Sequence, residues 1–332
     1  MADSAALADA RYREVQALTR AVVGAVGDLW RDVSPDRILA ALQGETGLAI
    51  LRAVTAGQAT AAAGAQAFVA ASMLAQGATL APLGVLDPAA LVGMAMDGRS
   101  LASLLYLPGI TTARALAVGE APELAALRGM TQMAMLTGTT IADTARTATS
   151  VAMAAESSCV MYVRVVSLPA CSRCIVLAGR TYSYSTGFKR HPQCDCGMRP
   201  LSERQWNDPA ELDQVKTARE LYDSMSPAER HRRFGGAAVK AMEHGADIEQ
   251  LVNARRGLAT AATRNGDALV TTEGTTRRGI GARAIGAAYE KQGGERYARS
   301  TERRLMPETI FQLAKGDREL EIAQLKKFGY IT

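Results

Sequence analysis

Aromatic side chains are scarce in this chain of 332 residues, in which Phe, Trp and Tyr together account for 5%. β-Sandwiches and β-barrels draw on aromatic and β-branched residues, so this scarcity, combined with abundant alanine, favours closely packed helices. The apolar content of 48% is ordinary for a globular protein and allows a sizeable core. We therefore expect a mainly α fold, and the length of the chain allows two or more domains.

The chain also lacks an apolar run at its start, where acidic residues interrupt MADSAALADARYREVQ, and no secretory signal is predicted. From Ala53 to Leu86 it lacks charge altogether, which raises the question of a membrane span. Ala, Gly, Thr and Gln fill this stretch, and these side chains gain little free energy in lipid. We expect a buried or self-associating helix of a soluble protein here, and no membrane partner.

Residues 1–158 are predicted to form a long Ala-rich helical domain. Apolar residues recur near one helical face in its first segment: Leu7, Val15, Leu18, Val22 and Val26. Ser34 and Asp87, each followed by proline, are typical of helix starts, because the side chain can cap a helix and proline suits its first turn. Pro108-Gly109 is predicted to break the helical pattern, and a further long helix is expected from about Pro122 to Ala155.

Residues 159–205 differ in composition and are predicted to form a small α+β module. A β-rich run is expected before Pro169, with the members Val160, Tyr162, Arg164 and Val166. The letters AGRTYSYS, which begin at Ala178, predict a second short strand or a hairpin, and Pro200 closes the module.

Residues 206–332 are predicted to be helical and basic. Ser226 and Glu229 have the spacing of a capping box, and two short helices are expected on either side of Gly316-Asp317. The segment 265–284, rich in Gly, Thr and Arg, is interpreted as a flexible arm. Residues 251–332 hold 15 Lys and Arg against nine Asp and Glu, a net charge of +6, whereas the whole chain carries +5. The basic excess therefore lies in the final quarter, where it faces solvent, nucleic acid or an acidic partner.

The chain has only five cysteines, and four of them lie with one of its three histidines between residues 171 and 196. The spacing is Cys171-x2-Cys174 and, after sixteen residues, His191-x2-Cys194-x-Cys196. Thiolates and imidazoles are the ligands that zinc prefers, and four of them close a tetrahedral structural site. Cys171 and Cys174 are the firmer half of this assignment, while His191, Cys194 and Cys196 compete for the other two positions.

A bound metal would explain how this segment folds. The residues between the two half-sites, IVLAGRTYSYSTGFKR, are too small and polar to build a core, and an ion supplies folding free energy that burial does not. Clustered cysteines in odd number also fit a reduced compartment better than a disulfide framework. Two alternatives stay open: reduced cysteines packed without metal, and a redox or catalytic C-x2-C, which here lacks a βαβ context. The fifth cysteine, Cys159, is predicted to be a buried thiol.

The stretch ACSRCIVLAGRTYSYSTGFKRHPQCDCGMRP closely resembles the signature of MuF-like minor head proteins of tailed bacteriophages. The C-x2-C-x-x-L-x-G segment and the H-P-x-C-x-C element of that family, with its following proline, match Cys171, Cys174, Leu177, Gly179, His191, Pro192, Cys194, Cys196 and Pro200. The variant with Gly187, Phe188, Arg190 and His191 is most similar to proteins of actinobacterial phages, as are VNARRGLATAA, TTEGTTRRG and GDRELEIAQLKKFGYI. The resemblance covers roughly residues 160–332, and the helical N-terminal half shows no specific motif.

This resemblance implies a structural minor capsid protein that assists head morphogenesis or DNA delivery and is not an enzyme. Its expected place is the virion, in the head interior or at the portal vertex, and the host cytoplasm during assembly. The N-terminal helices would bind portal, scaffold or major capsid protein, in several copies, beside a module held together by structural Zn²⁺. Arg277, Arg278 and Arg283 could contact packaged DNA through its phosphates, whatever its sequence; a solvated arm is the alternative.

Proteins of this phage group are sometimes described as capsid maturation proteases, which is the competing hypothesis. A protease needs a nucleophile, a base and an orienting group, and none of His191, His231 and His244 lies in G-x-S-x-G or another recognisable frame. No catalytic or cofactor-binding residue is therefore predicted. An HNH-type nuclease would need further His and Asn around a second metal, and for an ADP-ribosyltransferase the pair Glu319 and Glu321 is only a weak signal.

Overall fold

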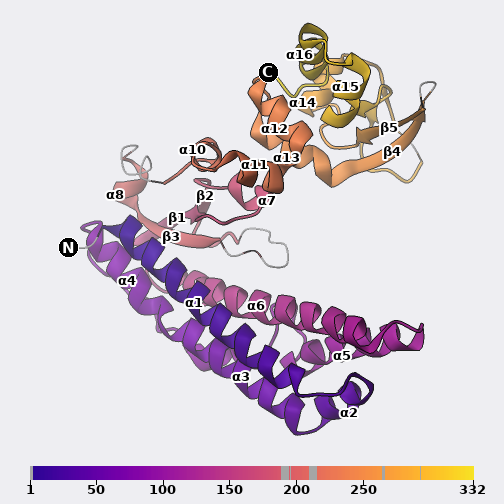
Figure 1. The fold of residues 1–332 in the computed structure, drawn as a ribbon. Coiled ribbons are helices and arrows are strands. Elements are labelled where there is room, and N and C mark those ends of the chain that lie inside the picture. The colour runs from indigo at the N-terminus through magenta and orange to yellow at the C-terminus, as the bar shows by residue number, and fades with distance from the viewer. Residues whose placement is uncertain (1–2, 188–193, 195, 209–214, 264–265, 292) are drawn as a thin grey trace. The chain divides into compact units, whose positions relative to one another are not determined.

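The computed structural model describes residues 3–187, 194, 196–208, 215–263, 266–291 and 293–332. The chain is mainly α-helical, as predicted, and small antiparallel sheets accompany the helices (Figure 1). It divides into two compact units: unit 1 comprises Met1–Ala170 and Ala178–Lys216, and unit 2 comprises Cys171–Leu177 and Thr217–Thr332. Unit 1 thus joins the predicted helical domain to most of the predicted α+β module.

Unit 1 is built on long helices that pack along one another (Figure 1). Its helices are α1 Ser4–Arg31, α2 Ile38–Gln43, α3 Glu45–Ala63, α4 Ala65–Ala75, α5 Leu101–Ala117, α6 Pro122–Ala154 and α8 Glu203–Trp206, with short 3-10 turns η1 Pro35–Arg37 and η2 Pro88–Leu91. The helix expected after Asp87 is only the turn η2, and α5 begins later, where the Ser100 hydroxyl accepts a hydrogen bond from the backbone N–H of Ser103. The long helix expected from about Pro122 is confirmed as α6.

The predicted break at Pro108-Gly109 is wrong, because α5 continues through both residues. Proline removes one hydrogen bond from a helix interior, but Pro108 is buried and its helix packs tightly on its neighbours. A Cβ at Gly109 would lie 2.6 Å from Cδ1 of Leu42 in α2, and one at Gly129 of α6 would lie 2.0 Å from Oγ1 of Thr112. The glycine at 109 therefore serves close helix packing in place of a helix stop.

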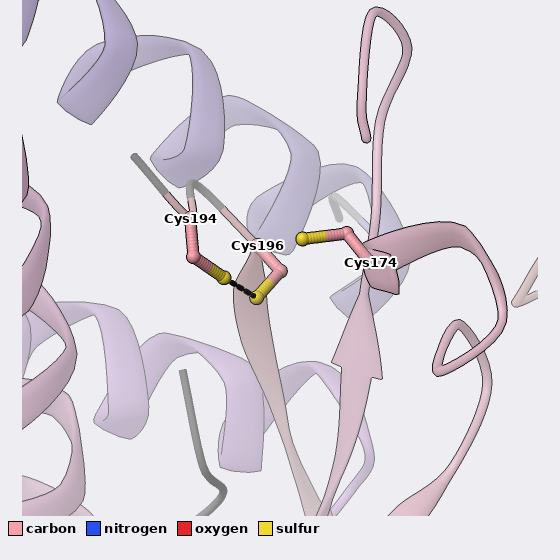
Figure 2. A group of neighbouring side chains, drawn as sticks. All are labelled: Cys174, Cys194 and Cys196. Atoms are coloured by element: carbon pink, nitrogen blue, oxygen red, sulfur yellow. Dashed lines mark hydrogen bonds between the residues drawn. The ribbon is translucent and has the colours of Figure 1, made fainter. Parts of the chain in front are cut away.

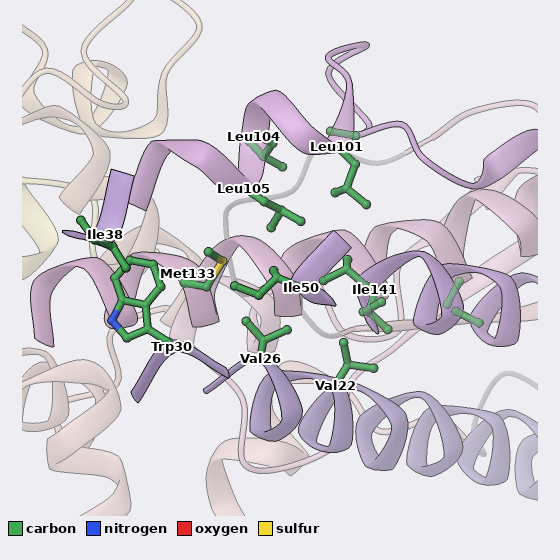
Figure 3. Packing of buried hydrophobic residues seen from close by; sticks show 14 residues of the cluster. Val22, Val26, Trp30, Ile38, Ile50, Leu101, Leu104, Leu105, Met133 and Ile141 are labelled. Atoms are coloured by element: carbon green, nitrogen blue, oxygen red, sulfur yellow. The ribbon is translucent and has the colours of Figure 1, made fainter. Parts of the chain in front are cut away.

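The hydrophobic core of unit 1 lies between α1, α3, α5 and α6 (Figure 3). Val26 of α1, Ile50 of α3, Leu101 of α5 and Met133 of α6 are each fully buried in it. The indole of Trp30 packs in the same cluster, and its Nε1 donates a hydrogen bond to a backbone carbonyl of α6 at 3.3 Å. The apolar face predicted for the first helix is confirmed, since its members lie in or against the two hydrophobic clusters of this unit: Leu7, Val15, Leu18, Val22 and Val26.

A three-stranded antiparallel sheet covers one end of the helices. Its strands are β1 Cys159–Val165, β2 Thr181–Ser183 and β3 Gly197–Ser202, in the order β2-β1-β3. In the register of the sheet, Tyr162 of β1 lies opposite both Tyr182 and Pro200. Tyr162 and Met198 pack with Phe68 of α4 in a second hydrophobic cluster, so the sheet and the helices share one core. The β-rich run and the second short strand are thereby confirmed.

Among the described residues, no single helix is both long enough and apolar enough to cross a membrane. One pair of helical segments, Pro35–Gln43 and Glu45–Ala75, meets the requirement only when taken together, and it is bent by 67°.

Unit 2 combines short helices with two small sheets. Its elements are α7 Ser172–Ile175, α10 Ala218–Asp223, α11 Pro227–Phe234, α12 Gly236–Glu243, α13 Ile248–Ala254, η3 Arg255–Gly257, β4 Leu258–Thr263, β5 Gly266–Thr271, α14 Ile280–Ile285, β6 Tyr289–Glu290, β7 Arg299–Ser300, β8 Arg304–Leu305, α15 Pro307–Ala314 and α16 Arg318–Lys327. The antiparallel sheets have the orders β4-β5-β8 and β6-β7. Ser226 and Glu229 form the predicted capping box at the start of α11. The two helices around Gly316 are confirmed, and the Asp317 side chain caps α16.

The predicted flexible arm, as far as it is described in residues 266–284, is instead the strand β5, a turn and the helix α14. Its glycines make room for Arg304, whose side chain is only 1% exposed. A Cβ at Gly281 would lie 2.5 Å from Nε of Arg304, and one at Gly274 would lie 2.6 Å from its Nη1. The glycine content that suggested flexibility is therefore explained by the close approach of a buried side chain.

Arg304 holds the end of the described chain in place. Its Nε donates to the carbonyl of Phe328 at 2.8 Å, Nη2 to that of Gly329 at 3.1 Å, and Nη1 to that of Glu273 at 3.1 Å. The guanidinium lies 4.3 Å from the ring centroid of Tyr330, and burial raises the pKa of Tyr330 to about 12. One buried cation thus joins three backbone segments of unit 2.

Candidate metal centre

Three of the five predicted ligands come together. The ligand atoms of Cys174, Cys194 and Cys196 lie within 4.8 Å of one another, and all three side chains are buried (Figure 2). Cys174 lies in α7, and Cys194 and Cys196 lie immediately before β3. The structure thus pairs a member of the first half-site with two members of the second, so the cluster could hold a metal ion.

The donor set fits a metal that prefers sulfur. Thiolates are soft ligands, which favour zinc, copper(I) and iron–sulfur clusters over magnesium or calcium. In tetrahedral zinc, Zn–S bonds of about 2.3 Å separate two sulfurs by about 3.8 Å. Cys194 Sγ and Cys196 Sγ are 3.0 Å apart, so these two side chains are hydrogen-bonded to each other and would move apart slightly around an ion (Figure 2). With this small shift, the three buried thiols could supply three of the ligands of such a site.

The other two predicted ligands are not part of this group of three. Cys171 is the N-cap of α7, where its Sγ accepts a hydrogen bond from the backbone N–H of Cys174 at 3.4 Å. His191 lies outside the described residues. Both keep their place as candidates for the fourth ligand, because a closed structural site needs four donors.

Two buried arginines adjoin the cysteines within unit 1. Arg146 of α6 donates from Nη1 to the carbonyls of Cys194, at 2.8 Å, and Cys196, at 3.2 Å. Arg164 of β1 donates from Nη2 to Sγ of Cys194 at 3.5 Å, and its side chain is 1% exposed. Positive charge beside the cluster stabilises thiolates, which are the form that binds metal.

The importance of Arg146 was not predicted from the sequence, although a signal exists. Between Gly129 and Ala155 the only charged residues are Asp143 and Arg146, three positions apart on an otherwise uncharged helix. Arg146 forms an ion pair with Asp143, and both side chains are largely buried. A lone charged pair in an apolar helix indicates a buried polar contact, but the sequence does not say with which segment.

Cys159 has no part in the cluster and is a buried thiol, as predicted. Burial raises its pKa to about 12, and the nearby Glu156 carboxylate acts in the same direction. The side chain therefore stays protonated near neutral pH and behaves as a small apolar group of the core.

The histidines bear on the competing protease hypothesis. In unit 2, Glu321 accepts a hydrogen bond from Nζ of Lys240 at 2.6 Å and contacts Nε2 of His244 at 2.9 Å, and these contacts lower its pKa. Nδ1 of His244 is buried and has no hydrogen-bond partner among the described residues. His231 lies on α11 and is exposed. Within the described chain, then, neither His231 nor His244 is hydrogen-bonded to a serine hydroxyl as a base would be.

Comparison with known proteins identifies a family. A family model described as VG15 protein matches residues 1–225, which include all of unit 1 and every candidate ligand. Comparisons with curated proteins and with solved structures find no match. The match reaches the helical N-terminal half, for which the sequence showed no specific motif, and it indicates a phage protein without specifying its role. Because the matched region is more than half of its length, the chain belongs to the VG15 protein family.

Proposed function

We propose that this phage protein is a structural minor capsid protein that takes part in head morphogenesis at the portal vertex and in the head interior. The family match over residues 1–225, which covers both the helical unit and the cysteine cluster, supports the phage part of this proposal. The role in the head is proposed from the motif resemblance around the cysteines, which the cluster of Cys174, Cys194 and Cys196 supports. On this proposal the long helices of unit 1 bind portal, scaffold or major capsid protein, in several copies per head.

The cluster is proposed to bind structural Zn²⁺. Cys174, Cys194 and Cys196 would supply three ligands, and Cys171 or His191 the fourth. An ion held this way would stabilise the start of β3, which Cys194 and Cys196 adjoin. No chemical step is assigned to it, because four protein ligands leave no open position for a substrate.

The test is complex formation during co-expression with the portal, scaffold and major capsid proteins of the same phage. We expect the chain to co-elute with the portal protein in size-exclusion chromatography and to be found in purified heads by mass spectrometry. Absence from heads together with failure to bind any of the three would contradict the structural role. Defined cleavage of scaffold or capsid protein that disappears on a single substitution in this chain would establish the protease hypothesis in its place.

Contact with packaged DNA is proposed for the basic surface of unit 2. Arg277 and Arg278 in the turn before α14, and Arg283 on α14, are exposed. The guanidinium of Arg277 also lies 5.5 Å from the ring centroid of Tyr289. Three exposed cations on one short segment suit electrostatic contact with phosphates.

Replacing these three arginines with glutamine is expected to weaken DNA binding and its dependence on salt. In a plot of the logarithm of the binding constant against the logarithm of salt concentration, three phosphate contacts contribute a slope of about −2.7. The part of the affinity that these contacts supply therefore falls about 40-fold between 50 and 200 mM salt. Fluorescence anisotropy with a labelled duplex measures both quantities. A control triple variant with the same charge change, Arg219, Arg232 and Arg233 to glutamine, should keep the original slope; equal slopes for all three proteins would refute the assignment.

A further inference from the structure

Arg146 makes a contact that is unusual for a helix residue. It lies in the C-terminal half of α6, its side chain is 7% exposed, and it reaches a segment that follows about fifty residues later. Its Nη1 donates to two backbone carbonyls at once, those of Cys194 and Cys196. Its Nη2 forms an ion pair with Asp143, one turn earlier on the same helix. A single guanidinium therefore ties both cysteines of the second half-site to the helical core.

The position of these contacts matters more than their number. The carbonyls of Cys194 and Cys196 belong to the residues whose sulfurs face each other at 3.0 Å. Fixing these two backbone oxygens limits the directions in which the side chains of Cys194 and Cys196 can point. Because arginine is planar and always charged, it holds both oxygens with one rigid group, which lysine does not do.

Asp143 in turn restrains the guanidinium. Its side chain is 14% exposed and accepts from Nη2, so Nη1 is left directed at the cysteine carbonyls. The remaining donor, Nε, is buried without a hydrogen-bond partner among the described residues. Burying Nε without a partner costs free energy. The contacts of the guanidinium with the two carbonyls and with Asp143 outweigh this cost.

We infer that Arg146 is the positioning residue of the metal centre: it holds the carbonyls of Cys194 and Cys196 against α6, so that both sulfurs face one point before an ion arrives. This inference rests on the proposed metal site. It adds that the ion and α6 are coupled through the hydrogen bonds of Arg146 to the two ligand residues. Partners that orient metal ligands without touching the metal change affinity by about 10–100-fold when they are removed. Occupancy of the site should therefore stabilise α6, and loss of Arg146 should weaken metal binding while leaving the ligands in place.

The experiment uses the full-length protein and measures zinc affinity by competition with a chromophoric chelator. The Arg146→Gln variant is expected to bind zinc about 10–100-fold more weakly than the original protein, and Asp143→Asn to show a smaller loss in the same direction. Arg128→Gln is the matched control, because Arg128 lies on the same helix but is 65% exposed and pairs with Glu120. Its zinc affinity should be unchanged.

Two further readouts separate positioning from a merely structural role. The rise in melting temperature on adding zinc should shrink in Arg146→Gln, whereas a purely structural loss would lower the melting temperature with and without zinc by the same amount. With cobalt(II) in place of zinc, the sulfur-to-metal charge-transfer band per bound ion should be unchanged, because Arg146 is not a ligand. A circular dichroism spectrum confirms that the variant is folded, and Asp143→Asn replaces it if it is not.

The outcomes are distinct. Zinc binding by the original protein with unchanged affinity in both Arg146→Gln and Asp143→Asn overturns the role of Arg146 and leaves the metal site standing. Absence of zinc binding by the original protein overturns the metal site and, with it, this inference. A weakened charge-transfer band in Arg146→Gln would mean that a ligand has been lost, which also contradicts a role in positioning alone.

Discussion

Replacing Cys194 and Cys196 together with serine is expected to remove bound zinc and to lower the melting temperature of unit 1 by about 8–16 °C. At free zinc a thousand times above the dissociation constant, binding stabilises a folded protein by about 4 kcal/mol. For a unit of this size, each kcal/mol corresponds to about 2–4 °C in melting temperature. Metal analysis of the purified protein and thermal melting followed by circular dichroism measure the two effects.

The control for this experiment is Cys159→Ala, which changes a buried cysteine that has no part in the cluster. It should retain one zinc per chain, even though loss of a buried sulfur lowers stability somewhat. Addition of a strong chelator to the original protein should reproduce the lowered melting temperature of the double variant. Zinc-free native protein whose melting is unaffected by either the chelator or the double substitution would rule out the metal site.

Truncating Arg304 to alanine is expected to destabilise unit 2 by about 4 kcal/mol, which lowers its melting temperature by roughly 15 °C. The substitution leaves the carbonyls of Glu273, Phe328 and Gly329 without their donor, and each buried acceptor that loses its partner costs about 1–3 kcal/mol. It also opens a cavity between Tyr330 and the glycines that now make room for the guanidinium. Hydrogen exchange of the α16 amides, together with thermal melting, reports the loss.

Arg303→Ala is the matched control for this second prediction. Arg303 precedes Arg304 in sequence, but it is exposed, and its one hydrogen bond to the described part of the chain is a long one of 3.3 Å to the carbonyl of Ala262. Surface substitutions of this kind change stability by about 0.5 kcal/mol or less. Equal stability of the two variants would mean that the buried guanidinium does not hold unit 2 together.

Local signals in the sequence predicted local structure well. The capping box at Ser226 and the cap at Asp317 depend on side chains within four residues of the helix they start, so the sequence contains all that is needed. The alternation in β1 and the long apolar helix α6 are similarly local patterns. In the cysteine cluster, the spacing predicted that the two groups of cysteines would meet, and Cys174, Cys194 and Cys196 do lie together.

Long-range packing accounts for what the sequence did not predict. Pro108 and the glycines of 266–284 are breakers in isolation, and only the segments packed against them show why they lie in ordered structure. The contact of Arg146 with Cys194 spans about fifty residues of sequence. No residue near Arg146 in the sequence indicates that the cysteine segment is its partner. Buried arginines in particular were missed, because a charged residue is expected at the surface unless its partner is known.

Both units are completed by segments that the ribosome makes late. The hydroxyl of Ser4, at the start of α1, accepts hydrogen bonds from Arg199 at 2.8 and 3.0 Å across 195 residues of sequence. At 5–20 residues per second, this first helix waits about 10–40 s during synthesis for that partner. Arg304 likewise finds two of its acceptors, the carbonyls of Phe328 and Gly329, only when the chain has been extended to Gly329. A nascent chain of this protein can therefore pack its long helices together well before the polar contact between Ser4 and Arg199 can form.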